Sequence, residues 1–188
     1  ALSSQGDRRG LYYSTSGDQG SWEDITPDGW PTSSFERTVL SINPSDEDEV
    51  WAIAKANGQV QGPHELWMYD RGTQTWTDST EYLPNGFFSQ GGYDLIVDVH
   101  PNDGNLLYAG DINLWRIDVS GSASDAATQI GGYAVSGNGL YDPPGSDPQH
   151  PDQHAIAFQP NNPDVMFSGS DGGIHRTDDN RAGGTGSA

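Results

Sequence analysis

Short runs of alternating apolar and polar residues recur along the chain, and turns rich in Gly, Asn, Asp, Ser and Pro separate them. Alternation with a period of two is typical of β-strands that bury one face. The sequence lacks the 3.6-residue period of an amphipathic helix. The pattern therefore predicts an all-β protein built from short antiparallel strands.

One arrangement of strands occurs three times. Each copy has an apolar strand, a turn with Pro among Asn and Asp, and a second apolar strand. The copies begin at Thr38 (TVLSINPSDEDEVWAIAKA), Tyr93 (YDLIVDVHPNDGNLLYAGDI) and His154 (HAIAFQPNNPDVMFSGSDGG). The turn prolines lie 57 and 59 residues apart, at Pro44, Pro101 and Pro160. A repeat of about this length matches a four-stranded blade of a β-propeller.

Further strand-like segments complete these repeats and flank them. They lie at residues 64–70 and 75–79, at 114–120 and 127–133, and, nearer the two ends, at 10–16, 21–26 and 173–179. Together with the three repeated pairs they predict about thirteen strands. Such regular spacing without helices favours a propeller over a mixed fold.

We therefore expect residues 1–188 to form a single partial β-propeller of about three to three and a half blades, each with four antiparallel strands. Its parts are the end of a blade (1–30), two blades (38–80 and 93–133) and the start of a blade (154–179). Propellers close with about four to eight blades, and open edges pair readily with other strands. The rest of the ring is expected from the same or another polypeptide. A complete small domain is the alternative.

The charge balance excludes some partners. The chain has 27 acidic and 8 basic residues, a net charge of -19, and Lys55 is its only lysine. Binding to nucleic acid or insertion into an anionic membrane is not expected, because the phosphates would be repelled. Salt would screen such self-repulsion, so a halophilic source is one prediction and an ordinary acidic secreted domain is the other. No cysteine is present to form a disulfide.

The sequence contains no apolar run of eighteen or more residues, so no membrane-spanning segment is predicted. The first residues, ALSSQGDRRG, include neither an initiator Met nor the pattern of a signal peptide. The expectation is that any targeting segment has been removed or lies outside this sequence.

Two predicted hairpins carry a recognisable motif, SGDQGSW (16–22) and YDRGTQTW (69–76). They resemble degenerate Asp boxes, the Ser-x-Asp-x-Gly-x-Thr-Trp hairpins of sialidase-type (BNR-like) and sortilin-type propellers. In such a hairpin the Asp side chain accepts backbone N–H groups, Gly takes a positive φ, and Trp packs between blades. The matching residues are Asp18, Gly20, Trp22, Asp70, Gly72, Thr75 and Trp76.

The repeats as a whole, from GFFSQGGYDLIVDVHPNDGNLLYAGDINLW to HPDQHAIAFQPNNPDVMFSGSDGGIHRTDD, are similar to large secreted bacterial proteins with sortilin-like or Asp-box propellers. The resemblance implies an extracellular or cell-surface location, and many of these proteins use the type nine export system. It specifies fold more than activity, because function on this scaffold depends on loops and strand ends. Three functions remain open: a non-catalytic segment for binding, adhesion or attachment; a glycoside hydrolase; and a subunit of a surface appendage or secretion-associated complex.

The segment HPDQHAIAF suggests a metal site, because His150, Asp152 and His154 stand at alternate positions. In an extended chain the three side chains would share one face, and imidazole with carboxylate suits a transition metal. The alternative, which we favour, is that Asp152 and His154 make hydrogen bonds that brace adjacent blades. No cofactor is assigned from the sequence.

Three acids, Asp94, Asp111 and Asp171, are candidates for catalysis because they lie near strand ends. The resemblance extends to xyloglucan hydrolases with Asp-box propellers, which use two catalytic Asp residues, and glycosidases in general need a pair of carboxyl groups. The adjacent glycines favour turn capping for Asp111 and Asp171 instead. A sialidase is not expected, because the seven Arg residues form no recognisable cluster.

Aromatic residues could contribute a surface for polysaccharide or for a surface protein, because Tyr and Trp stack on sugar rings. Tyr93 and Trp115 are candidates for such binding, whereas Trp51 and Trp67 fall in strand patterns and are predicted to be core.

The acidic turn at residues 46–49 could hold Ca²⁺, but it lacks the spacing of a known calcium loop, so a solvated turn is expected. The proline-rich loop at residues 142–152 is a further candidate for a ligand or partner surface.

Overall fold

The computed structural model describes residues 2–3, 9–30, 35–56, 64–90, 93–133 and 149–182. In these residues the strands form four antiparallel sheets, and helical structure is confined to two short 3-10 turns, η1 (Thr80–Tyr82) and η2 (Ala123–Asp125). The predicted all-β fold is therefore confirmed.

The strands follow sequence order within every sheet. The first sheet contains β1 (Leu2–Ser3), β2 (Gly10–Tyr13) and β3 (Glu23–Asp24). The second contains β4 (Phe35–Ile42), β5 (Glu49–Ala56), β6 (His64–Asp70) and β7 (Thr75–Asp78). The third contains β8 (Ile96–His100), β9 (Asp103–Gly110), β10 (Leu114–Asp118) and β11 (Ala127–Gly131). The fourth contains β12 (Gln153–Phe158), β13 (Met166–Ser170) and β14 (Gly173–Thr177).

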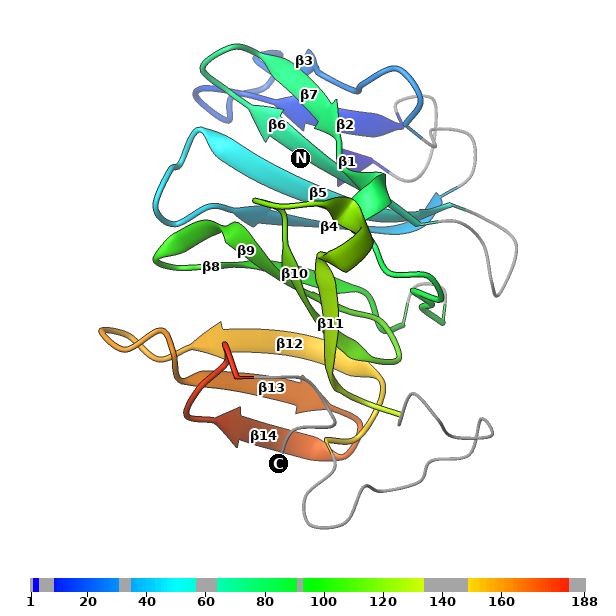
Figure 1. Cartoon of the computed structure of the whole chain (residues 1–188). Helices are drawn as coiled ribbons and strands as arrows, with labels where there is room; N and C mark the ends of the chain where they lie inside the picture. Colours follow the sequence, from blue (N-terminus) through cyan, green and yellow to red (C-terminus); the bar gives the residue numbers. More distant parts are fainter. Residues whose placement is uncertain are drawn as a thin grey trace.

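The four sheets are stacked in the order of the sequence (Figure 1). Strand β8 contacts both β4 and β12, so the first strands of the last three sheets lie next to one another. This arrangement is that of successive propeller blades, in which the first strand of each blade is the innermost. The predicted turns with Pro44, Pro101 and Pro160 connect the first and second strands of these sheets.

Most observed strands match the predicted segments, but β2 and β3 are shorter than the predicted 10–16 and 21–26, and one strand is added. Strand β6 has the predicted bounds, and β7, β10, β11 and β14 begin where predicted and end one or two residues earlier. The two-residue strand β1 was not predicted, and with it the described residues contain fourteen strands. It pairs with β2 through Leu2 and Ser3, a contact too short to leave an alternating pattern.

Alternation along the strands gives the second and third sheets two buried faces. In β5, Ile53 faces the third sheet and packs in a cluster with Leu66, Val97 and Leu107. The neighbouring Ala52 faces the first sheet instead. A third cluster joins the third and fourth sheets through Leu106, Tyr108, Leu114 and Met166. Burial of apolar surface between sheets is thus the main force that holds the stack together.

The two Asp-box-like hairpins differ in geometry. In the second, Asp70 Oδ1 accepts the backbone N–H of Thr73 at 3.1 Å, and Trp76 donates its indole N–H to the carbonyl of Ile25 in the first sheet. Its positive φ falls at Gln74 (58°), not at Gly72.

In the first hairpin the positive φ values belong to Gly17 (78°) and Gly20 (87°). The carbonyl of Asp18 accepts the backbone N–H of Ser21. Trp22, unlike Trp76, is 45 % exposed. Compared with the Asp-box motif, the first loop is one residue shorter and the second is one residue longer. This difference in length explains why their glycines differ in conformation.

Candidate functional site

The segment before β8, residues 87–90 and 93–94, lies where the second, third and fourth sheets meet. The backbone N–H of Phe88 donates to Asp111 Oδ2 of the third sheet, and the backbone N–H of Gln90 donates to Asp94 Oδ1. The side-chain amide of Gln90 reaches the fourth sheet and donates to Asp152 Oδ1 at 2.8 Å. The segment is therefore fixed by side chains from neighbouring blades.

A buried pair from the second sheet anchors Ser89 in this segment. Lys55 and His64 are paired across β5 and β6, and both are buried. The ammonium of Lys55 donates to the Ser89 carbonyl at 3.1 Å, and His64 Nε2 lies 2.6 Å from Ser89 Oγ. Burial, together with the charge of Lys55, lowers the pKa of His64 to about 4, so the imidazole is neutral at pH 7.

Tyr93, His154 and Asp171, which we call the Tyr93 surface, come together at the junction of the third and fourth sheets. The Tyr93 hydroxyl lies 2.7 Å and 2.9 Å from the two carboxylate oxygens of Asp171. His154 Nε2 lies 2.6 Å from Asp171 Oδ1. The rings of Tyr93 and His154 meet edge to face with centroids 4.8 Å apart. Tyr93 is nevertheless 50 % exposed, so a fixed aromatic ring faces solvent.

Hydrogen bonds from His154 and Tyr93 lower the pKa of Asp171, which is therefore ionised at neutral pH. The predicted turn capping by Asp171 does not occur, because its side chain contacts His154 and Tyr93 instead. Asp152 joins neighbouring blades as predicted, through the Gln90 side chain and through its own backbone N–H, which donates to the Ile112 carbonyl. The hydrogen bond of His154 stays within the fourth sheet, at Asp171, and its ring reaches the preceding blade only through Tyr93.

His150, Asp152 and His154 do not share one face. The segment bends before β12 because Asp152 has a φ of 63°, in the left-handed region. His150 Nδ1 lies 2.9 Å from the carbonyl of Pro151, and its side chain packs on Gly172, where an added Cβ would lie 2.4 Å from His150 Cβ. In the described part of the chain, no three His, Cys, Asp or Glu residues form a group able to hold a metal ion.

Two of the three candidate catalytic acids are fully buried. Asp111 accepts N–H groups from Phe88, Asn113 and Trp115, so it caps its own turn as predicted and also holds the segment before β8. Burial raises the pKa of Asp111 to about 7. Burial also raises the pKa of Asp94, whose Oδ2 is buried without a hydrogen-bond partner.

The remaining candidates from the sequence are the tryptophans, the acidic turn and the proline-rich loop, and the described ones make contacts within the fold. Trp51 and Trp67 are buried as predicted, and Trp115 is partly buried against the cluster between the second and third sheets. Glu49 of the acidic turn accepts the indole N–H of Trp51 at 2.6 Å, and Asp48 pairs with Arg71. Of the predicted loop at 142–152, residues 142–148 lie outside the described residues.

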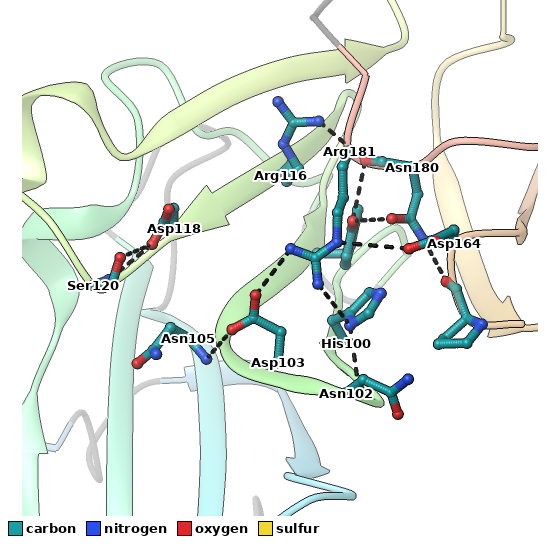
Figure 2. A network of polar contacts seen from close by, with 12 residues as sticks. His100, Asn102, Asp103, Asn105, Arg116, Asp118, Ser120, Asp164, Asn180 and Arg181 are labelled. Carbon is teal, nitrogen blue, oxygen red and sulfur yellow. Dashed lines mark hydrogen bonds and ion pairs between the residues drawn. The ribbon is translucent and has the colours of Figure 1, made fainter.

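A second polar network joins the third and fourth sheets (Figure 2). Arg181 donates to Asp103 Oδ2 at 2.9 Å, lies 3.7 Å from Asp164, and approaches His100 Nδ1 at 3.4 Å. Arg116 donates to the Asn180 carbonyl at 3.0 Å. These contacts fasten the segment after β14 to the third sheet.

Four residues that hold the segment before β8 in place were not predicted from the sequence: Lys55, His64, Ser89 and Gln90. Lys55 offered a signal, because the only lysine of the chain stands within the apolar strand WAIAKA. A charged residue at a buried strand position needs a polar partner. The partner, Ser89, is 34 residues away and could not be identified without the fold.

The fold is similar to parts of two solved β-propeller enzymes. One is a GH74 enzyme of Niastella koreensis, with a TM-score of 0.54 and 20% identity over 93% of this chain and 27% of that chain. The other is the GH74 xyloglucanase of Xanthomonas campestris, with a TM-score of 0.51 and 16% identity over 86% of this chain and 23% of that chain. The chain thus spans about a quarter of the length of these proteins and has the fold of a β-propeller segment.

Searches against protein-family models and against curated proteins find no match for the chain. Among the described residues, no helix is long and apolar enough to cross a membrane.

Proposed function

We propose that the chain is a non-catalytic segment of an extracellular or cell-surface β-propeller and that its Tyr93 surface binds polysaccharide. The remaining blades would come from the same or another polypeptide, as in the sortilin-like and Asp-box proteins that the hairpins resemble. The observation that carries the proposal is Tyr93, which is half exposed although both its hydroxyl and its ring are held by neighbours.

The chemistry of the Tyr93 surface suits a sugar. An exposed aromatic ring that is already fixed loses little conformational entropy when a sugar stacks on it. Asp171 and His154 supply polar atoms beside the ring for hydroxyl groups. Because both come from the fourth sheet, the surface forms only when the two blades pack together.

The surroundings of the acids argue against catalysis by these residues. A glycosidase needs two carboxyl groups that reach the substrate, one with a raised pKa that serves as the acid. Asp94 and Asp111 have raised pKa values but are fully buried. Asp171 is partly exposed, but its lowered pKa does not suit a general acid.

Hydrolysis is the alternative function, and the fold shared with two GH74 enzymes favours it. Release of new reducing ends from a soluble polysaccharide that the protein binds would support this alternative. Binding without such release supports the proposed function.

The proposal predicts that Tyr93→Ala weakens polysaccharide binding. In affinity electrophoresis with a panel of soluble neutral and amino-bearing polysaccharides, we expect about a tenfold loss of affinity, because the stacking surface is removed. Trp22→Ala is the matched control, since Trp22 is 45 % exposed and precedes β3 in the first sheet, at the other end of the stack (Figure 1). Equal effects of the two substitutions, or no retarded migration with any polysaccharide, would contradict the proposal.

A further inference from the structure

The charges around the Tyr93 surface are predominantly negative. Asp171 belongs to it, and the charges of Asp152 and Asp94 also act on the Tyr93 hydroxyl. Among the described residues, the Arg37 guanidinium donates to the Tyr93 carbonyl at 2.9 Å, and the imidazoles of His154 and His150 lie near Asp171. The field at the ring is therefore set mainly by carboxylates, in a chain whose net charge is -19.

Asp94 adds an independent observation. Its side chain is fully buried, and Oδ2 has no hydrogen-bond partner in the described structure. The electrostatic interactions of this carboxyl group include Asp152 and His154, so it lies close to the polar side of the surface. Burial raises the pKa of Asp94, which means that the protein disfavours its charged form, and a cation bound near this carboxyl group would offset part of that cost.

An aromatic ring with ionised carboxylates beside it can bind an ammonium group in two ways. The ring face attracts the cation, and the carboxylate accepts its N–H groups in charge-assisted hydrogen bonds. Asp171 already accepts the Tyr93 hydroxyl and His154, and it keeps further lone pairs toward solvent because its side chain is 34% exposed. A neutral sugar could stack on the Tyr93 ring but would gain no charge-assisted hydrogen bond from the Asp171 carboxylate.

We propose that the ligand of the Tyr93 surface is an amino sugar unit with a free ammonium group, as in a deacetylated amino-polysaccharide. This inference rests on the proposed function and specifies its ligand. The sugar ring stacks on Tyr93, and the ammonium group donates to Asp171. Acetylation of the amine would remove the charge and most of the preference.

The inference is tested by calorimetric titration with three oligomers of equal length, made of glucosamine, N-acetylglucosamine or glucose. We expect the glucosamine oligomer to bind at least about tenfold more tightly than the other two at about 0.05 M NaCl, and the difference to shrink at about 0.5 M NaCl. Asp171→Asn should abolish the preference. Asp28→Asn, which removes the same charge from an exposed turn of the first sheet, should leave it intact.

Each outcome separates the inference from the proposed function. Equal binding of neutral and amino oligomers, with loss in Tyr93→Ala, would overturn the amino sugar and leave the polysaccharide-binding function in place. Equal losses in Asp171→Asn and Asp28→Asn would also overturn it, because the preference would then be non-specific attraction to an acidic protein. If no oligomer binds but a polysaccharide of the electrophoresis panel does, the amino sugar is overturned and the proposed function stands; if neither binds, both fail.

Discussion

At the scale of single residues, burial changes the acid–base chemistry of the groups that build the site. Asp111 and His64 support the same segment before β8, one through Phe88 and the other through Ser89. Burial favours the uncharged form of each, so the pKa of Asp111 rises to about 7 and that of His64 falls to about 4. The two groups therefore affect stability in opposite directions as the pH changes.

Asp111 predicts a pH dependence of stability. Between its ordinary pKa near 3.8 and its folded value of about 7, the folded protein holds a proton that the unfolded chain has lost. The contribution of Asp111 is thus full below about pH 4 and is lost as the pH rises to about 7. At about 1.4 kcal/mol per pKa unit, the loss is at most about 4 kcal/mol.

Urea unfolding of the wild type and of Asp111→Asn at about pH 4.5 and about pH 7.5 measures this effect. The fall in unfolding free energy between the two pH values should be smaller in the variant, because an amide does not titrate. An identical fall in both proteins would refute the assignment.

At the scale of elements, the segment after β14 is tied to the third sheet by polar contacts as well as by packing. Arg181 and Arg116 each reach across from one sheet to the other, as drawn in Figure 2. The buried Tyr108 of β9 adds its hydroxyl, which lies 2.8 Å from Asn180 Oδ1 and 3.1 Å from the Asn180 carbonyl. The backbone N–H of Asn180 in turn donates to the main-chain carbonyl of Asp164 at 2.9 Å. Asn180 thus links β9 to the turn before β13.

Tyr108→Phe should loosen this link. We expect a loss of about 1 kcal/mol in unfolding free energy, because a buried hydrogen bond is removed. We also expect faster hydrogen exchange at the backbone N–H of Asn180. Tyr82→Phe is the matched control, since the Tyr82 hydroxyl makes only a long, exposed contact of 3.4 Å with Gly121. If the two variants exchange equally fast at Asn180, the hydroxyl of Tyr108 is not what holds the segment.

At the scale of the whole molecule, a stack of apolar interfaces carries a strongly acidic surface. The net charge of -19 on 188 residues repels itself at low ionic strength and is screened as salt rises. The halophilic source inferred from the composition stays a prediction, but its physical basis can be measured.

The melting temperature should therefore rise when NaCl increases from about 0.05 M to about 1 M. A variant with Asp28, Glu47 and Glu81 replaced by their amides should show a smaller rise, because all three are exposed and add to the repulsion. A melting temperature that is indifferent to salt in both proteins would show that self-repulsion does not limit stability.

The sequence by itself determined the all-β class, the three repeats and the position of nearly every strand. This was possible because strands buried on one or both faces carry alternating or continuous apolar residues, and tight turns demand Gly, Pro, Asn and Asp. It also singled out Tyr93, Asp111, His154 and Asp171 as polar or aromatic residues at strand ends. Contacts within a hairpin or along a strand are local, so their signals lie close together in the chain.

Only the tertiary structure decided which of these residues face solvent and which meet. Tyr93 and Asp171 are 78 residues apart and touch because two blades pack side by side. Asp94 and Asp111 are buried, whereas Asp171, with a similar sequence context, is not. Packing between blades sets these differences, and it depends on the faces of whole sheets, which no short stretch of sequence specifies.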